Sequence, residues 1–176
     1  LFDDLMAQHP EIEWMPTLES DRGCPYKCTF CDWGGLTASK VVKFGLERVF
    51  AELEWFSDKK LPFLTMTNAN FGIFKERDHI IVDMLIEAKE KYGYPKMYFV
   101  NWAKNANEDI LQMAKKLYDA KLIKTFIMSL QTLTQDALEL IKRDNMDINK
   151  YTFFANRCKE LELPFDCELN EFKINL

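Results

Sequence analysis

The chain has 176 residues, of which 48% are hydrophobic and 29% charged, and this composition predicts a folded globular segment. Its 23 Lys and Arg residues against 28 Asp and Glu residues give a formal charge of −5, so no positive field would attract a nucleic acid backbone. No apolar run approaches the roughly 20 residues that span a bilayer, and the acidic start does not resemble a signal peptide. We therefore expect a cytoplasmic protein with no nucleic acid or membrane partner.

The first half of the chain alternates predicted strands with predicted helices. Glu13–Leu18 is a weak first strand that leads into a group of cysteines, and Phe63–Thr67 is a short, partly β-branched apolar run typical of a buried strand. Between them, Leu46–Phe56 has apolar residues at helical spacing. A second helix ends at Gly93, and its predicted inner face consists of Ile80, Ile81, Met84, Leu85 and Ala88.

The same alternation continues to the end of the chain. Further strands are predicted at Met97–Val100, Ile123–Leu130 and Phe165–Leu169. Three residues can cap the intervening helices at their N-termini, namely Asn107, Thr134 and Asp147. The first of these helices has Ile110, Met113, Ala114 and Leu117 on its predicted inner face. Regular βα repetition predicts parallel strands joined by helical crossovers.

Three of the five cysteines lie within eight residues, in a C-x3-C-x2-C loop formed by Cys24, Cys28 and Cys31. The loop directly follows a predicted strand, where βα folds place their sites. Three thiolates on a short loop can hold three irons of a cubane cluster and leave the fourth iron open to a ligand. The spacing therefore predicts a reactive iron–sulfur cluster.

Two other uses of these cysteines are possible. A structural zinc prefers two cysteine pairs, but Cys158 and Cys167 belong to a predicted helix and a predicted buried strand and are poor partners. A redox pair made of Cys28 and Cys31 leaves Cys24 without a purpose. Both alternatives explain the loop less well than a cluster does.

Three segments resemble the radical S-adenosylmethionine (SAM) superfamily, and more narrowly those members that carry an upstream cobalamin-binding domain. They are ESDRGCPYKCTFCDWG at 19–34, NANFGI at 68–73 and SLQ at 129–131. The resemblance extends from about Trp14 to Leu169. It divides the chain into an N-terminal lead-in at 1–13, a radical SAM core at 14–169 and a divergent tail at 170–176.

The resemblance implies an α/β fold, a partial (β/α)6 barrel with a [4Fe-4S] cluster at the carboxyl ends of its strands. About five parallel strands are expected here, with the sixth missing. The implied cluster ligands are Cys24, Cys28 and Cys31, with SAM bound to the open iron. The implied SAM contacts are Phe30 near the adenine, Asn68 and Asn70 near the methionine moiety, and Ser129, Gln131 and Arg143 at its polar groups.

The resemblance also implies a reaction. An electron from the reduced cluster would enter the sulfonium of SAM, and the resulting 5′-deoxyadenosyl radical would abstract a hydrogen atom from a small-molecule substrate that the sequence does not name. An electron donor such as a flavodoxin or ferredoxin is then an expected partner. In a cobalamin-dependent family, cobalamin held by a domain outside this chain would support methylation or rearrangement. A cobalamin-independent radical SAM protein and a non-catalytic thiolate–zinc module are the alternatives.

The sequence departs from the family pattern at two places. Asn68 stands where Asp is more usual, which removes a charge-assisted hydrogen bond to a cationic cofactor and predicts weaker SAM binding. After Leu169 the family has a glycine- and proline-bearing loop, whereas this chain has Asn170 to Leu176. A sheet that ends at its fifth strand has an unpaired edge, so we expect association through that edge. Length permits one complete domain, but the first residues resemble mid-protein sequence, so a piece of a longer protein is equally compatible.

Overall fold

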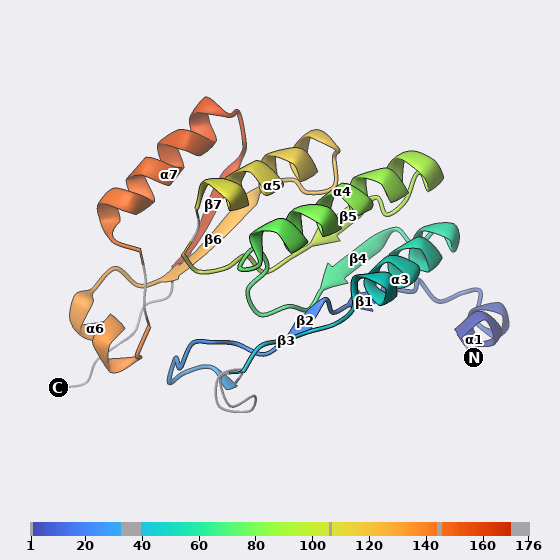
Figure 1. Ribbon diagram of the computed structural model, residues 1–176, viewed down its shortest axis with the longest axis horizontal. Coiled ribbons are helices and arrows are strands. Elements are labelled where there is room, and N and C mark those ends of the chain that lie inside the picture. Colours follow the sequence, from blue (N-terminus) through green and yellow to red (C-terminus); the bar gives the residue numbers. More distant parts are fainter. Residues whose placement is uncertain (1, 33–39, 106, 144–145, 170–176) are drawn as a thin grey trace.

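The computed structural model describes residues 2–32, 40–105, 107–143 and 146–169. It shows an α/β arrangement in which the helices α3 (Leu46–Asp58), α4 (Lys75–Tyr92) and α5 (Glu108–Asp119) lie side by side along the strands (Figure 1). The predicted tail at 170–176 lies outside the described residues, as do Trp33 and Gly34 of the first similarity segment.

All five predicted strands are present, and every pairing between them is parallel. β1 (Thr17–Leu18), β4 (Phe63–Met66) and β5 (Met97–Phe99) form one sheet in the order β1-β4-β5. β6 (Phe126–Gln131) and β7 (Phe165–Leu169) form a separate pair. Within the described residues no ladder joins β5 to β6, so the strands pair as three and two. The first strand is shorter than expected.

The helices lie where the sequence predicts them. α3, α4 and α5 follow β3 (Val42–Lys43), β4 and β5 in that order. α6 (Gln135–Leu140) and α7 (Ile148–Glu160) connect β6 to β7. α3 packs on α4, α4 packs on α5, and α7 packs on β7. The β-α repetition predicted from the sequence is thus confirmed from β4 onward.

All four predicted helix ends are confirmed in position, but one of them lacks the predicted side-chain cap. The Asn107 side chain accepts a hydrogen bond from the backbone N–H of Ile110 (3.1 Å), and Asp147 accepts one from Lys150 (2.9 Å). Gly93 ends α4 with a left-handed φ of 74°. Thr134 precedes α6, but its side chain makes no capping hydrogen bond.

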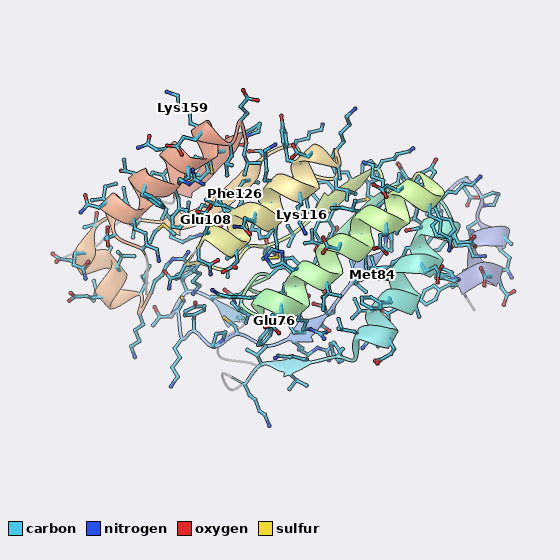
Figure 2. All side chains as sticks on the ribbon, turned by 45° about the horizontal axis from the view of Figure 1, so that its top comes forward. Glu76, Met84, Glu108, Lys116, Phe126 and Lys159 are labelled. Carbon is cyan, nitrogen blue, oxygen red and sulfur yellow. The ribbon has the colours of Figure 1, made fainter. Side chains whose placement is uncertain are left out.

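Helices and strands share one hydrophobic core. The predicted inner face of α5 is fully buried, because Ile110, Met113, Ala114 and Leu117 all have no exposed surface. The predicted face of α4 was partly wrong, since Ile80 is 44% exposed and Val82 is buried in its place. Polar side chains cover the outer helix faces, as Glu76 and Lys116 illustrate in Figure 2.

The two faces of the strands differ. Alternate side chains such as Leu64, Tyr98 and Met128 are buried in the core that the helices cover. The intervening positions are less covered, and on β5 and β6 they carry Phe99 and Ile127, which are 44% and 47% exposed. This open face leads to the cavity described below.

Three elements were not predicted from the sequence. α1 (Phe2–Gln8) lies within the expected lead-in, and β2 (Asp21–Arg22) and β3 (Val42–Lys43) form a small antiparallel ribbon next to the cysteine loop. The Arg77 guanidinium at the start of α4 donates to the backbone oxygens of Ser20 (2.9 Å) and Phe44 (2.6 Å) and ties this ribbon to the helix. None of the described helices is long and apolar enough to cross a membrane.

Candidate functional site

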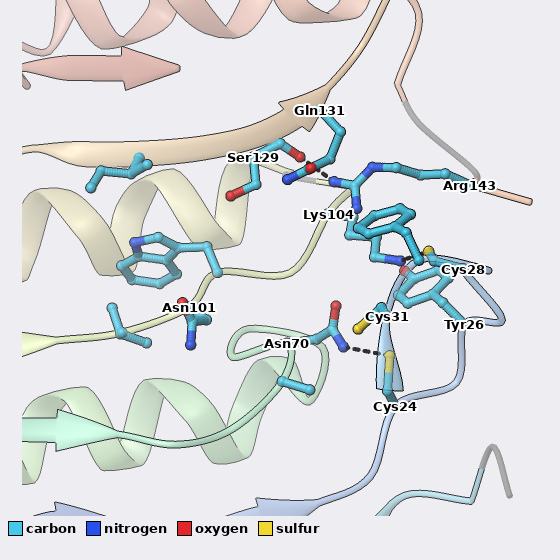
Figure 3. Close-up of a pocket in the computed structure, with 15 residues that line it drawn as sticks. Cys24, Tyr26, Cys28, Cys31, Asn70, Asn101, Lys104, Ser129, Gln131 and Arg143 are labelled. Carbon is cyan, nitrogen blue, oxygen red and sulfur yellow. Dashed lines mark hydrogen bonds between the residues drawn. The ribbon is translucent and has the colours of Figure 1, made fainter. Parts of the chain in front are cut away.

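A cavity of about 410 Å³ lies at the carboxyl ends of β4, β5 and β6 and beside the cysteine loop (Figure 3). Its lining contains every site residue predicted from the sequence except Asn68, namely Cys24, Cys28, Phe30, Cys31, Asn70, Ser129, Gln131 and Arg143. These residues are far apart in the sequence. The parallel strands of the two sheets bring them together because the carboxyl ends of β4, β5 and β6 all lie beside this cavity.

The cysteine loop contributes three free thiols to this cavity. Cys24 and Cys28 are buried, with 6% and 7% of their surface exposed, and Cys31 is half-buried. The backbone N–H of Thr29 donates to the carbonyl of Ile141 (2.9 Å), and this bond fastens the loop to the end of α6. Phe30 is 45% exposed at the rim.

Two nitrogen donors contact the cysteine sulfurs. Asn70 Nδ2 donates to Cys24 Sγ (3.2 Å), and Lys104 Nζ donates to Cys28 Sγ (2.7 Å). Lys104 also lies over the ring of Tyr26, with Nζ 4.1 Å from the ring centroid. The cavity therefore supports two of its thiols with hydrogen bonds from loops that follow neighbouring strands.

Sequence reasoning missed part of this lining. Tyr26, Asn101, Trp102 and Lys104 all line the cavity, and the last three follow the carboxyl end of β5. The same rule that singled out the residues after β4 and within β6 applies to β5, because ligands bind outside the carboxyl ends of parallel strands. That signal could have identified Lys104.

The end of β6 contributes a third group of polar side chains. The pairing of β6 with β7 shifts register between Ser129 and Gln131, and Gln131 has a left-handed φ of 69°. The guanidinium of Arg143 donates to the backbone oxygen of Ser129. Arg143 is only 8% exposed, so this contact places its charge at the cavity and not in solvent beyond α6.

Asn68 does not line the cavity, in contrast to the sequence-based expectation. Its side chain is fully buried, and its Oδ1 accepts a hydrogen bond from the backbone N–H of Ser20 (3.0 Å). Its Nδ2 donates to Ser20 Oγ (2.7 Å) and to the Asp21 carboxylate. Residues 68 and 70 end the same strand, but the intervening turn sends one amide into the fold and the other into the cavity.

The Asp21 carboxylate beside Asn68 has a shifted pKa. Burial and the nearby carboxylate of Asp78 raise the pKa of Asp21 to about 6, although Arg77 opposes the shift. Burial likewise raises the pKa of Asp78, whose Oδ2 accepts hydrogen bonds from the backbone N–H groups of Gly72 (2.8 Å) and Phe74 (3.0 Å). These two carboxylates form a buried acidic pair beneath the turn that follows β4.

The three thiols of the cavity suit an iron–sulfur cluster better than a single metal ion. Within the described residues, no group of three or more His, Cys, Asp or Glu side chains is arranged to hold a single metal ion. A cubane cluster makes a different demand, because each of its thiolate ligands binds a different iron atom. Three free thiols on one cavity wall meet that demand, and the buried Asn70 Oδ1 has no hydrogen-bond partner, so a polar ligand can be accepted beside them.

Two curated proteins are similar to this chain in amino-acid sequence. No family model matches the chain. It is 41% identical over 139 residues to the cobalamin-dependent radical SAM methyltransferase TokK of Streptomyces tokunonensis, a match that covers 79% of this chain and 20% of that protein. It is also 41% identical over 147 residues to the 2-(S-pantetheinyl)-carbapenam-3-carboxylate methyltransferase of Streptantibioticus cattleyicolor, which covers 84% of this chain and 21% of the relative. The chain thus spans about a fifth of the length of these relatives.

The fold is similar to that of a solved enzyme. The radical SAM methyltransferase TsrM from Kitasatospora setae superposes with a TM-score of 0.69 at 12% identity, over 93% of this chain and 31% of TsrM. This chain and TsrM therefore share a fold although their sequences have diverged widely. Sequence similarity and fold together place this chain in the radical SAM superfamily, with a methyltransferase named as cobalamin-dependent among its relatives.

Proposed function

We propose that this chain is the part of a radical SAM enzyme that holds a [4Fe-4S] cluster and SAM. The ligands of the cluster would be Cys24, Cys28 and Cys31. The observation that carries the proposal is that these three thiols share one cavity with polar side chains from the ends of β4 and β6. When bound, the cluster supplies the electron that cleaves SAM reductively to methionine and a 5′-deoxyadenosyl radical.

The other cavity residues would bind and orient SAM. Asn70 offers an amide oxygen without a partner, and Arg143 offers a cationic group that can attract a carboxylate. Ser129 and Gln131 line the same side of the cavity as Arg143 (Figure 3). Phe30 is 45% exposed and lies at the rim of the cavity. The burial of Cys24 and Cys28 would limit the access of water to the reacting groups.

In the whole protein, the β1-β4-β5 sheet and the β6-β7 pair would form parts of one curved sheet, a partial barrel. Support for such a partial barrel comes from the cavity, whose lining draws on β6 and on the loops after β4 and β5. The rings of Trp102 and Phe126 also meet across the gap between the two sheets, with centroids 5.6 Å apart. The fold of TsrM, which matches 93% of this chain, is consistent with this arrangement.

The whole protein would use cobalamin held outside this chain to methylate a small-molecule substrate. The names of the two curated relatives support this part of the proposal, because both are methyltransferases and one is described as cobalamin-dependent. An external electron donor such as a flavodoxin or ferredoxin would reduce the cluster. The alternative outcome of such cobalamin-linked radical chemistry is rearrangement of the substrate.

Anaerobic reconstitution with iron and sulfide tests the proposal. We expect about four irons per chain and a brown protein, and substitution of Cys24, Cys28 or Cys31 by Ala should remove most of this iron. Cys167→Ala is the matched control, since this free cysteine lies on β7 and does not line the cavity. A colourless protein that binds one zinc per chain would contradict the proposal and support a structural module.

Binding of SAM is tested on the same material. Addition of SAM should change the electron paramagnetic resonance spectrum of the reduced cluster, because three thiolate ligands leave one iron open. Arg143→Met should weaken this response while the iron content stays unchanged. An unchanged spectrum at saturating SAM would show that the open iron is not available to it.

A further inference from the structure

Lys104 donates a side-chain hydrogen bond to a cysteine of the motif, and the proposed SAM contacts do not include this lysine. Its Nζ is 2.7 Å from Cys28 Sγ. It belongs to the loop after β5 and is separated from Cys28 by 76 positions in the sequence. The contact is therefore a product of the fold and not of a local turn.

The lysine is held in place by groups other than the thiol. The Tyr26 ring lies 4.1 Å from Nζ and belongs to the cysteine loop itself, between Cys24 and Cys28. A cation over an aromatic ring is attracted to it, so Tyr26 keeps the ammonium group at the loop. Lys104 is half-buried, which places the charge at the cavity and partly shields it from solvent.

The backbone below Lys104 is fixed by a parallel bridge between Phe71 and Trp102. The N–H of Phe71 donates to the carbonyl of Asn101, and the N–H of Ala103 donates to the carbonyl of Phe71, both at 2.9 Å. Phe71 is fully buried and directly follows Asn70, the donor to Cys24. One bridge therefore holds both loops from which the two N–H···S donors project (Figure 3).

We propose that Lys104 is a positioning residue that donates an N–H···S hydrogen bond to Cys28 in the cluster-bound protein and raises the reduction potential of the cluster. This inference rests on the proposed function. A thiolate bound to iron can still accept a hydrogen bond, and reduction potentials of iron–sulfur clusters depend on hydrogen bonds to sulfur and on nearby charge. Reduction adds one electron and hence one negative charge to the cluster, and a cation at Cys28 stabilises that charge.

Potentiometric titration with dithionite as reductant, followed by electron paramagnetic resonance, tests the inference. Lys104→Met removes the donor and the charge and should shift the potential to a more negative value. Lys104→Arg keeps both and should stay near the wild type, and Lys104→Gln keeps an N–H donor alone and should lie between. If Lys104→Met takes up too little iron to titrate, the Gln variant provides the comparison.

Lys27→Met is the matched control. Lys27 is next to Cys28 in the sequence, but its side chain is exposed and does not line the cavity. Its loss should leave the potential unchanged, because solvent screens an exposed charge. An equal shift in the Lys27 and Lys104 variants would reduce the effect to net charge and overturn the inference.

Two further outcomes separate the possible failures. An unchanged potential in Lys104→Met, together with weaker SAM binding, would make Lys104 a SAM contact and overturn its role toward Cys28. A wild-type chain that takes up no cluster would contradict the proposed function itself, and the inference with it.

Discussion

Gly23 packs so closely against Lys40 that a Cβ atom on Gly23 would lie 2.1 Å from the Lys40 backbone oxygen. The φ of Gly23 is 117°, a conformation that residues with a side chain rarely adopt. Gly23 directly precedes Cys24 and follows β2, so it sets the direction in which the cysteine loop leaves the ribbon. The loop depends on a glycine at this position for two independent steric reasons.

Gly23→Ala should therefore disturb the cysteine loop. We expect a loss of unfolding free energy of about 3 kcal/mol, because a backbone carbonyl must move and the residue adopts a strained φ. Urea unfolding measures the stability, and iron content after reconstitution measures the loop. Gly45→Ala is the control, since its Cβ would meet only the flexible Glu47 side chain, at 3.1 Å. Equal stability of the two variants would show that the ribbon yields without cost.

Asn68→Asp should destabilise the fold. The sequence alone predicted that a carboxylate here would strengthen SAM binding, but Asn68 donates to the buried Asp21 carboxylate and does not line the cavity. A second carboxylate at this place would repel the first and remove a donor, at a cost of about 2–4 kcal/mol at neutral pH. Thermal unfolding against exposed Asn156→Asp measures the effect. Tighter SAM binding with unchanged stability would restore the sequence-based assignment.

Asp21→Asn should stabilise the protein above pH 6. Folding raises the pKa of Asp21 from 3.8 to about 6, so the folded state binds this proton more tightly than the unfolded state does. The unfolding free energy consequently falls as the pH rises through this window. The substitution removes that loss and should add about 1–3 kcal/mol at pH 7.5 and almost nothing near pH 4. Unfolding curves at both pH values check it, with exposed Asp166→Asn as the control.

The isolated chain should self-associate. In the described part of the chain β7 pairs with β6 alone, and the open face of the strands exposes Phe99 and Ile127. Unpaired strand edges and exposed apolar surface both favour association. Sedimentation velocity at increasing concentration should show oligomers, and an assay for 5′-deoxyadenosine should show few turnovers of SAM. A clean monomer with many turnovers would contradict this expectation.

The elements of the fold were predictable wherever a local pattern determines them. The helical spacing of Ile110 to Leu117 and the capping positions of Asn107 and Asp147 are properties of short segments, and the structure confirms them. The gap between β5 and β6 is not such a property. It depends on how the two sheets meet, and the rings of Trp102 and Phe126 contact each other at that place. No periodicity in the sequence encodes such a contact between distant segments.

The cysteines that line the cavity could be predicted from the sequence, whereas the side-chain contacts made to them could not. Spacing singled out Cys24, Cys28 and Cys31 as candidate ligands, because residues on one short loop are close in the sequence as well as in space. Asn68 and Asn70 have the same type and lie two residues apart, yet only Asn70 faces the cavity. Both side chains are buried, and which of them faces the cavity depends on the partner available, here Ser20 and Asp21 at the start of β2.

The bridge between Phe71 and Trp102 also determines how movement passes through the cavity wall. A ligand that displaced Asn70 would pull on Phe71, and we expect the two backbone hydrogen bonds of the bridge to pass that displacement to Asn101 and Ala103. Because Lys104 follows immediately, the two loops should then move together. Their amide protons should accordingly exchange with solvent at similar rates, and a ligand held by one loop should slow exchange in both.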